Sequence, residues 1–107
     1  MSNPWRGEVR LVIDGTAHEM RLTLGALAEL EAGLGEDSLV GLIRRFEEGQ
    51  YAARDVLALI VAGLRGGGWK GEARDLLTAT VEGGPLAASK AAAELLARAF
   101  MTPGESA

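Results

Sequence analysis

The glycine-rich segment 66–71, which reads Gly-Gly-Gly-Trp-Lys-Gly, carries the strongest suggestion of chemistry in this chain. Backbone amides beside glycines can hold a phosphate, and a lysine can neutralise its charge. A phosphate-binding loop of that kind, however, follows a strand and places serine or threonine directly after the lysine. Here an apolar helical pattern precedes the glycines and Gly71 follows Lys70. The segment is therefore predicted to be a connector between helices.

The other polar residues give little support to acid–base or metal chemistry. Three acidic pairs have spacings that point side chains apart on a helix, namely Glu29 with Glu31, Glu36 with Asp37, and Glu47 with Glu48. His18 is the single histidine, and a partly buried structural role is the better interpretation of it than a ligand or a proton relay. No cysteine is present, and no serine has a histidine and an acid at a recognisable offset. We expect no catalytic residue, no metal site and no cofactor, hence a binding protein rather than an enzyme.

Composition narrows the choice of partner. The chain has 107 residues, of which 48% are hydrophobic, and a formal net charge of -4. The acidic balance argues against a nucleic-acid partner, because phosphate binding depends on Lys and Arg. No apolar run approaches the roughly 20 residues of a membrane span, and no signal-peptide pattern opens the chain. We expect a cytoplasmic protein with no membrane partner, forming a single domain over 1–107 with flexible ends at 1–6 and 102–107.

Residues 8–21 predict a β-hairpin with one register. Asp14-Gly15 suits the centre of a two-residue type I′ turn. The apolar face then pairs Val9 with Met20, Leu11 with His18 and Ile13 with Thr16, and the other face pairs Glu8 with Arg21 and Arg10 with Glu19. A slip by one residue would mix the two sets. Because a lone hairpin is marginal in water, we expect helices to cover its apolar face.

The rest of the chain predicts about five short helices. Thr23 and Ser38 can cap the first two, which Gly35 and Gly49 end. The third begins near Ala53, is apolar nearly all round and is expected to be central. Glycines 66–68 break it, a fourth helix covers about 72–82, and a fifth covers 86–101 with Pro85 in its first turn. The expected fold is α+β, with one N-terminal hairpin packed on about five short helices.

Individual residues in these helices carry further expectations. Gly25 and Gly63, which lie inside helical patterns, are expected to mark tight helix contacts. Arg44 and Arg45 are expected to lie in solvent, on the polar side of the second helix.

Three aromatic residues are the candidates for contact with a partner: Trp5 before the first strand, Trp69 in the connector and Phe100 in the last helix. Aromatic side chains are enriched at binding hot spots. Two alternatives stay open, since Trp69 could pack over the edge of the core and Trp5 could close the open end of the hairpin.

A series of short motifs resembles one known family. They are Arg6-Gly7-Glu8-Val9, Asp14-Gly15, the run Arg-Leu-Thr-Leu-Gly-Ala-Leu at 21–27, Glu29-Leu30-Glu31, and Ala62-Gly63-Leu64-Arg65. They resemble the small tail assembly chaperones of gene transfer agents and long-tailed prophages, a family also labelled as tail tube protein. The resemblance implies a protein that binds tail tube and tape measure proteins until the tube polymerises, and a homo-oligomer is possible. An outer strand of the hairpin would then pair with a partner's sheet edge, and an apolar helix face would cover tape measure helices.

Two other functions are less favoured by the sequence. The chain could itself be a structural subunit of the tail tube or head–tail junction, although a hairpin with helices is poor material for a ring of sheets. A small DNA-binding regulator is disfavoured by the acidic charge and the lack of a basic recognition helix.

Overall fold

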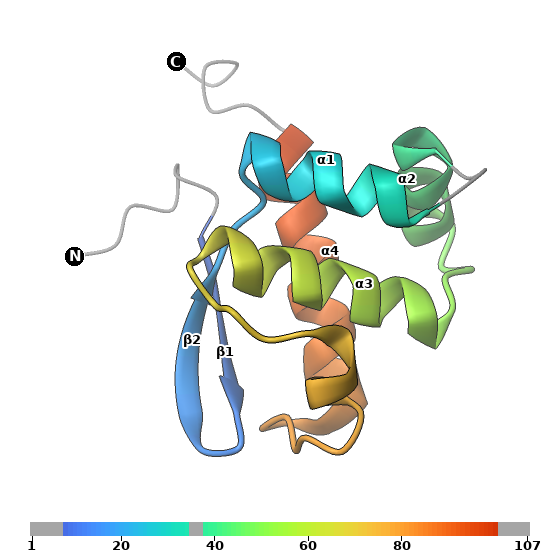
Figure 1. Cartoon of the computed structure of the whole chain (residues 1–107). Helices are drawn as coiled ribbons and strands as arrows, with labels where there is room; N and C mark the ends of the chain where they lie inside the picture. Colours follow the sequence, from blue (N-terminus) through green and yellow to red (C-terminus); the bar gives the residue numbers. More distant parts are fainter. Residues whose placement is uncertain (1–7, 35–37, 101–107) are drawn as a thin grey trace, which may run out of the picture.

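A computed structural model describes residues 8–34 and 38–100 of the chain (Figure 1). In these ranges the elements are β1 (Val9–Ile13), β2 (Thr16–Met20), α1 (Leu24–Gly33), α2 (Leu39–Glu47), α3 (Ala53–Gly66), the 3-10 helix η2 (Ala73–Leu76) and α4 (Gly84–Phe100). The fold is α+β, as predicted, but it has four α-helices where about five were expected. The predicted flexible ends at 1–6 and 102–107, and the helix stop at Gly35, lie outside the described residues.

The hairpin has the predicted register. Val9 pairs with Met20, Leu11 with His18 and Ile13 with Thr16. Asp14 and Gly15 form the turn with φ angles of 51° and 80°, the left-handed values that this residue pair tolerates best. Val9, Leu11 and Ile13 of β1 are buried, together with Met20 of β2.

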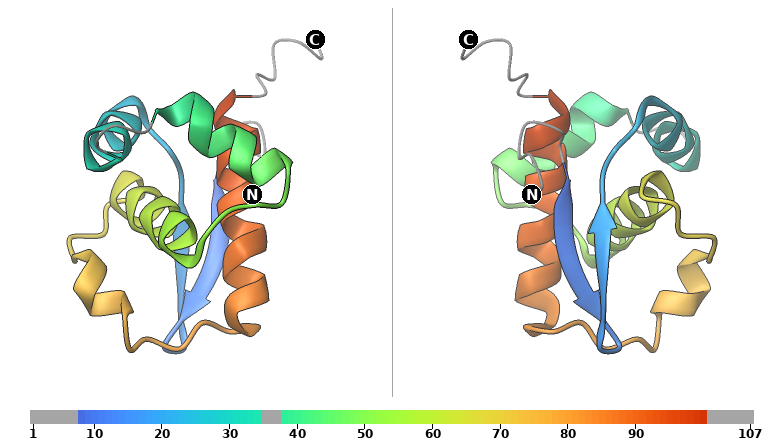
Figure 2. Two further views of the ribbon diagram at one scale, coloured as in Figure 1. Left: turned by 90° about the vertical axis from the view of Figure 1, so that its right-hand side faces the viewer. Right: turned by 90° about the vertical axis from the view of Figure 1, so that its left-hand side faces the viewer.

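Helices α3 and α4 cover the apolar face of the hairpin. α3 packs on β2, α4 packs on β1, and the two helices pack on each other (Figure 2). The largest fully buried side chains come from the hairpin and from three helices: Met20, Leu42, Leu59, Leu64 and Leu95. The third predicted helix is therefore central, as its composition indicated.

Both predicted helix caps are present, and one of the two predicted glycine contacts is present. The Thr23 and Ser38 hydroxyls accept hydrogen bonds from the first turns of α1 and α2. A Cβ at Gly63 would lie 2.6 Å from a methyl group of Leu95, so this glycine permits the close approach of α3 and α4. The expectation for Gly25 was wrong, because a Cβ there would meet only the Thr23 hydroxyl, at 4.0 Å.

The predicted fourth helix, over about 72–82, is only the single turn η2. The residues after it form a β-bridge instead, in which Val81 pairs with Ile13. The Asp14 amide donates to the Thr80 carbonyl, the Asp14 carboxylate accepts from the Thr80 amide at 2.9 Å, and the Glu82 amide donates to the Val12 carbonyl. Thr78, Thr80 and Val81 are β-branched and favour extended backbone. These contacts with β1 outweigh the helical pattern.

Candidate interaction surface

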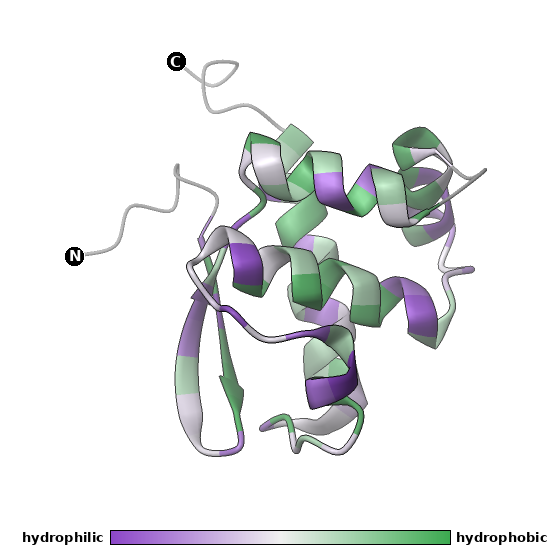
Figure 3. Ribbon diagram, viewed as in Figure 1, coloured by the Kyte–Doolittle hydropathy of each residue, from purple (hydrophilic) through white to green (hydrophobic). Residues whose placement is uncertain are grey.

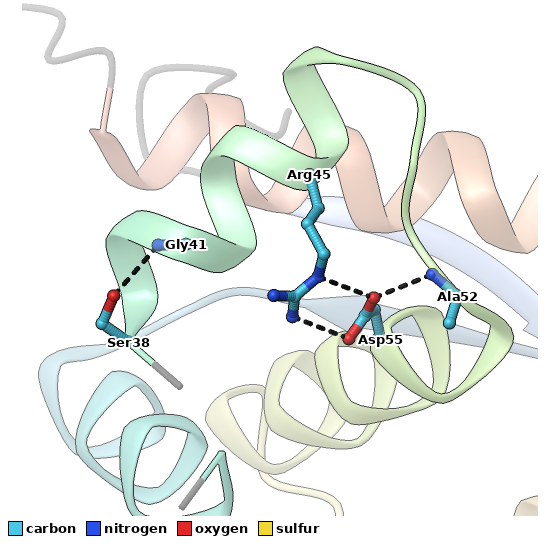
Figure 4. A network of polar contacts seen from close by, with 5 residues as sticks. All are labelled: Ser38, Gly41, Arg45, Ala52 and Asp55. Carbon is cyan, nitrogen blue, oxygen red and sulfur yellow. Dashed lines mark hydrogen bonds and ion pairs between the residues drawn. The ribbon is translucent and has the colours of Figure 1, made fainter. Parts of the chain in front are cut away.

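The most elaborate polar cluster joins α2 to α3 (Figure 4). The Arg45 guanidinium donates two hydrogen bonds to the Asp55 carboxylate, at 3.1 and 3.0 Å, and the Ala52 amide donates a third at 2.8 Å. Asp55 is 4% exposed. The expectation that Arg45 lies in solvent was wrong, because the crossing of α2 over α3 places its half-buried head on this carboxylate.

Opposing effects act on the pKa of Asp55. Burial raises this pKa, but the Arg45 and Ala52 hydrogen bonds and the charges of Arg45 and Arg54 outweigh burial and hold it below its usual value. The carboxylate is therefore ionised and fully paired at neutral pH. Within 8–34 and 38–100, no buried side-chain nitrogen or oxygen atom lacks a partner. Sequence reasoning missed this pair, which fastens α2 to α3 and offers no free group for chemistry.

The glycine-rich segment is a connector, as predicted. Three of its amides are already bonded to carbonyls of α3: the Gly67 and Gly68 amides to the last turn, and the Trp69 amide to Leu64. A Cβ at Gly66 or Gly67 would overlap the carbonyl oxygen of Arg21 or Glu19. The glycines therefore let the end of α3 touch the backbone of β2, and their amides are not available to an anion.

Each edge of the hairpin is covered in part by other segments of the chain. Residues 80–82 bond to β1, and the Arg21 amide, just past β2, donates to the Gly63 carbonyl at 3.0 Å. Gly66 and Gly67 lie against the outer backbone of β2. The expectation that an outer strand adds to a partner's sheet does not fit this arrangement, since little free strand edge remains.

The three aromatic candidates have different surroundings. Trp69 is half-buried, packs against the core and stacks over Gly71. Together with Ile13, His18 and Leu64 it lines a small hollow. Core-edge packing of Trp69 is therefore confirmed, and His18 is half-buried, as predicted. Phe100 is 42% exposed at the end of α4, away from the loop that carries Trp69 (Figures 1 and 2). Trp5 lies outside the described residues, so contact with a partner stays a prediction for all three.

The outer face of α4 carries an exposed apolar stripe that Lys90 interrupts. Leu86, Ala93, Ala97 and Phe100 follow each other at spacings of seven, four and three residues, which puts them on one stripe of the helix. Leu86 is 71% exposed, and the opposite side of α4 holds the buried Leu95 and Leu96. The helix thus presents an apolar side to the core and another to solvent.

A groove of about 450 Å³ runs between α1 and α3, the two helices in front in Figure 1. It is lined by Leu30 and Gly33 of α1 and by Leu57, Ala58 and Val61 of α3, with Arg54, Arg65 and Glu29 among the polar residues. Figure 3 shows the apolar turns of α3 between two hydrophilic ends. Sequence reasoning missed this groove, because a pattern that is apolar nearly all round predicted a central helix and gave no sign of which side stays open.

The described residues were compared with what a metal site and a membrane span require. Within the described ranges, no three His, Asp or Glu side chains are grouped as a metal site requires. No helix in those ranges has the length and apolarity to cross a bilayer. The groove and the α4 stripe, both apolar, are therefore the surfaces most suited to contact with another protein.

Comparison with known proteins identifies a family. The model of the family described as phage tail tube protein, GTA-gp10, matches residues 6–102, nearly the whole chain. No curated protein and no solved structure matches it. The match confirms the family resemblance carried by the N-terminal motifs, and the description uses the tube label rather than the chaperone label.

Proposed function

We propose that this chain, which belongs to the phage tail tube protein family GTA-gp10, is a structural component of a phage-type tail, in the tube or at the head–tail junction. One observation carries the proposal, namely the family match over residues 6–102. Tubes are built from many copies in closed rings, so the role requires contacts with other tail subunits and with further copies of this chain.

The fold limits how such a subunit joins its neighbours. Within residues 8–34 and 38–100 the sheet has two strands, and each of its edges is partly covered by other segments of the chain. Strand addition is therefore a poor means of assembly here. The α1–α3 groove and the apolar stripe of α4 are better suited to the contacts.

A tail assembly chaperone is the second candidate role, and the covered sheet edges favour it. Partly covered edges leave little strand backbone for copolymerisation with a β-rich tube subunit, while exposed apolar helix surfaces can hold such a subunit or a tape measure helix in solution. The partners on this hypothesis are the tail tube and tape measure proteins, and the chain leaves before the particle is complete.

Quantification of the chain in purified particles separates the two roles. Mass spectrometry of particles from the native host should find the chain at a copy number comparable to that of other ring-forming tail proteins if it is structural. Absence from particles, with tube or tape measure protein retained on the tagged chain from the cell extract, would reject the structural role and establish the chaperone. A folded Phe100→Ser variant with unchanged retention of tail proteins would remove Phe100 from the contact surface.

A further inference from the structure

The floor of the α1–α3 groove is an apolar helix face with no described element over it. Leu57, Ala58 and Val61 of α3 are each half-buried, whereas Leu59 and Ile60 on the other side of the helix are fully buried. Half-buried positions at spacings of one, three and four residues form a continuous stripe. A partner with a complementary apolar ridge would complete the burial of this stripe.

The charged residues that line the groove are Arg54 at one end and the paired Arg65 and Glu29 at the other, an excess of one positive charge in a chain whose net charge is -4. Arg54 and Arg65 both line it and stand eleven residues apart, about 16 Å along the helix at 1.5 Å per residue. Arg65 is held at the rim, since it donates to Glu29 at 3.2 Å and to the Gly71 carbonyl at 3.2 Å. Arg54 is exposed, and no hydrogen bond or ion pair joins it to the residues of 8–34 and 38–100, although its charge helps to lower the pKa of the neighbouring Asp55.

We propose that this groove binds an amphipathic α-helix of a partner protein whose apolar stripe is flanked by carboxylates. Residues eleven apart fall on nearly the same side of a helix with 3.6 residues per turn, so one helix can match both the apolar floor and the two guanidinium groups. Charge complementarity selects an acidic helix and adds specificity to apolar contact. The proposal holds whether the chain stays in the tail or leaves it.

A second copy of the chain fits the groove less well. The α4 stripe is its best apolar helix face, but Lys90 is the charged residue within that stripe. The nearby Glu94 carboxylate is already paired with Arg98 at 3.5 Å. An α4 helix placed in the groove would therefore add the positive charge of Lys90 to a groove that already has an arginine at each end.

The test uses the full chain and two synthetic helical peptides of 18 residues labelled with fluorescein. Both carry the same Leu and Ala stripe, and two flanking positions eleven residues apart are Glu in one peptide and Lys in the other. Fluorescence anisotropy at low salt should show binding of the Glu peptide at least about tenfold tighter than that of the Lys peptide, with the preference shrinking as salt screens the charges. Equal binding of both peptides, or no binding of the Glu peptide, would overturn the proposal.

Variants locate the site. Arg54→Glu should weaken binding of the Glu peptide at least about tenfold, and Val61→Glu should abolish it. Arg44→Glu, which changes an exposed arginine on α2 outside the groove, should leave it unchanged. Equal losses in Arg54→Glu and Arg44→Glu would mean non-specific attraction and overturn the proposal.

Two further measurements complete the test. Circular dichroism and the melting temperature check that each variant is folded. If Val61→Glu is not folded, the milder Leu57→Gln replaces it. Full peptide binding by either variant in its folded form would reject the groove as the binding site. Sedimentation shows whether a second copy is the occupant: self-association abolished by either variant, without peptide binding, would overturn the proposal.

Discussion

Helix α3 has two faces that differ in how closely they are packed. Toward α4, Gly63 lies against the Leu95 side chain, and toward the hairpin, Gly66 and the following Gly67 lie against the backbone of Arg21 and Glu19, with no room for a Cβ at any of the three glycines. Toward α1, Leu57 and Val61 lie at a groove of about 450 Å³. The first face uses glycine to exclude everything but the chain itself, and the second leaves apolar side chains available.

The comparison suggests where this protein meets others. A face on which two backbones touch admits no partner without unfolding, so the hairpin acts as a support for α3 and α4. The open face can gain further burial without any rearrangement, at roughly 25 cal/mol per Å² of apolar surface covered. The ion pairs of α3 also differ in burial. The Asp55 carboxylate that pairs with Arg45 is 4% exposed, whereas the side chains of Arg65 and Glu29, which pair beside the groove, are 39% and 59% exposed.

The largest expected loss of stability comes from replacing a glycine with alanine where α3 touches the hairpin. Gly66→Ala puts a methyl group onto the Arg21 carbonyl oxygen, which cannot move without displacing β2. The free energy of unfolding should fall by about 3 kcal/mol or more. The matched control is Gly33→Ala, where a Cβ meets nothing within 4 Å at the end of α1. Gly33→Ala should leave stability unchanged or raise it by up to about 1 kcal/mol. Urea denaturation measures the unfolding free energy of both variants. Similar changes in the two would show that α3 does not touch β2 this closely.

Removal of the buried carboxylate should have the next largest effect. Asp55→Asn leaves the Arg45 guanidinium without its anion while retaining one acceptor for the Ala52 amide, and should cost about 2 to 3 kcal/mol. Asp75→Asn is the matched control, because Asp75 accepts from the Glu72 amide in the same local geometry, at 2.8 Å, but is exposed. Its cost should stay below about 1 kcal/mol. Equal costs in urea denaturation would show that Asp55 acts only as a local cap.

The same carboxylate predicts a pH dependence with a defined sign. The pKa of Asp55 is lower in the folded state than its ordinary value, so the folded state binds fewer protons than the unfolded state. The resulting stability is fully present above the unfolded pKa of about 3.9 and is lost as pH falls through the lower folded pKa. The difference in unfolding free energy between wild type and Asp55→Asn should therefore shrink as the pH is lowered from 6 toward about 3. A constant difference across that range would contradict the assignment.

The features that local sequence determines were predicted well. The hairpin register follows from Asp14-Gly15 and from alternating apolar and charged residues within a few positions. The first two helices begin at Thr23 and Ser38 because the caps are adjacent to the turns they stabilise.

The features that depend on tertiary contact were missed. Arg45 and Asp55 are ten residues apart on different helices, and only the crossing of those helices joins them. The segment after η2 gave up its helical pattern for bonds to β1, sixty-six residues away in sequence. The groove beside α3 was missed because the period of an apolar pattern does not distinguish a face covered by the chain from a face covered by a partner.

The ion pair on the open side should contribute least to stability. Glu29→Gln removes the carboxylate that Arg65 contacts at 3.2 Å, but both side chains remain largely in water, where such pairs contribute about 0.2 to 1 kcal/mol and are screened by salt. Urea denaturation at low and high salt should show a small loss that disappears with salt. The same variant frees Arg65 for an incoming carboxylate, so the acidic helical peptide should bind at least as tightly as to wild type. A large loss of stability would mean that the open side is held together by this pair, and the contrast between the two faces of α3 would then no longer stand.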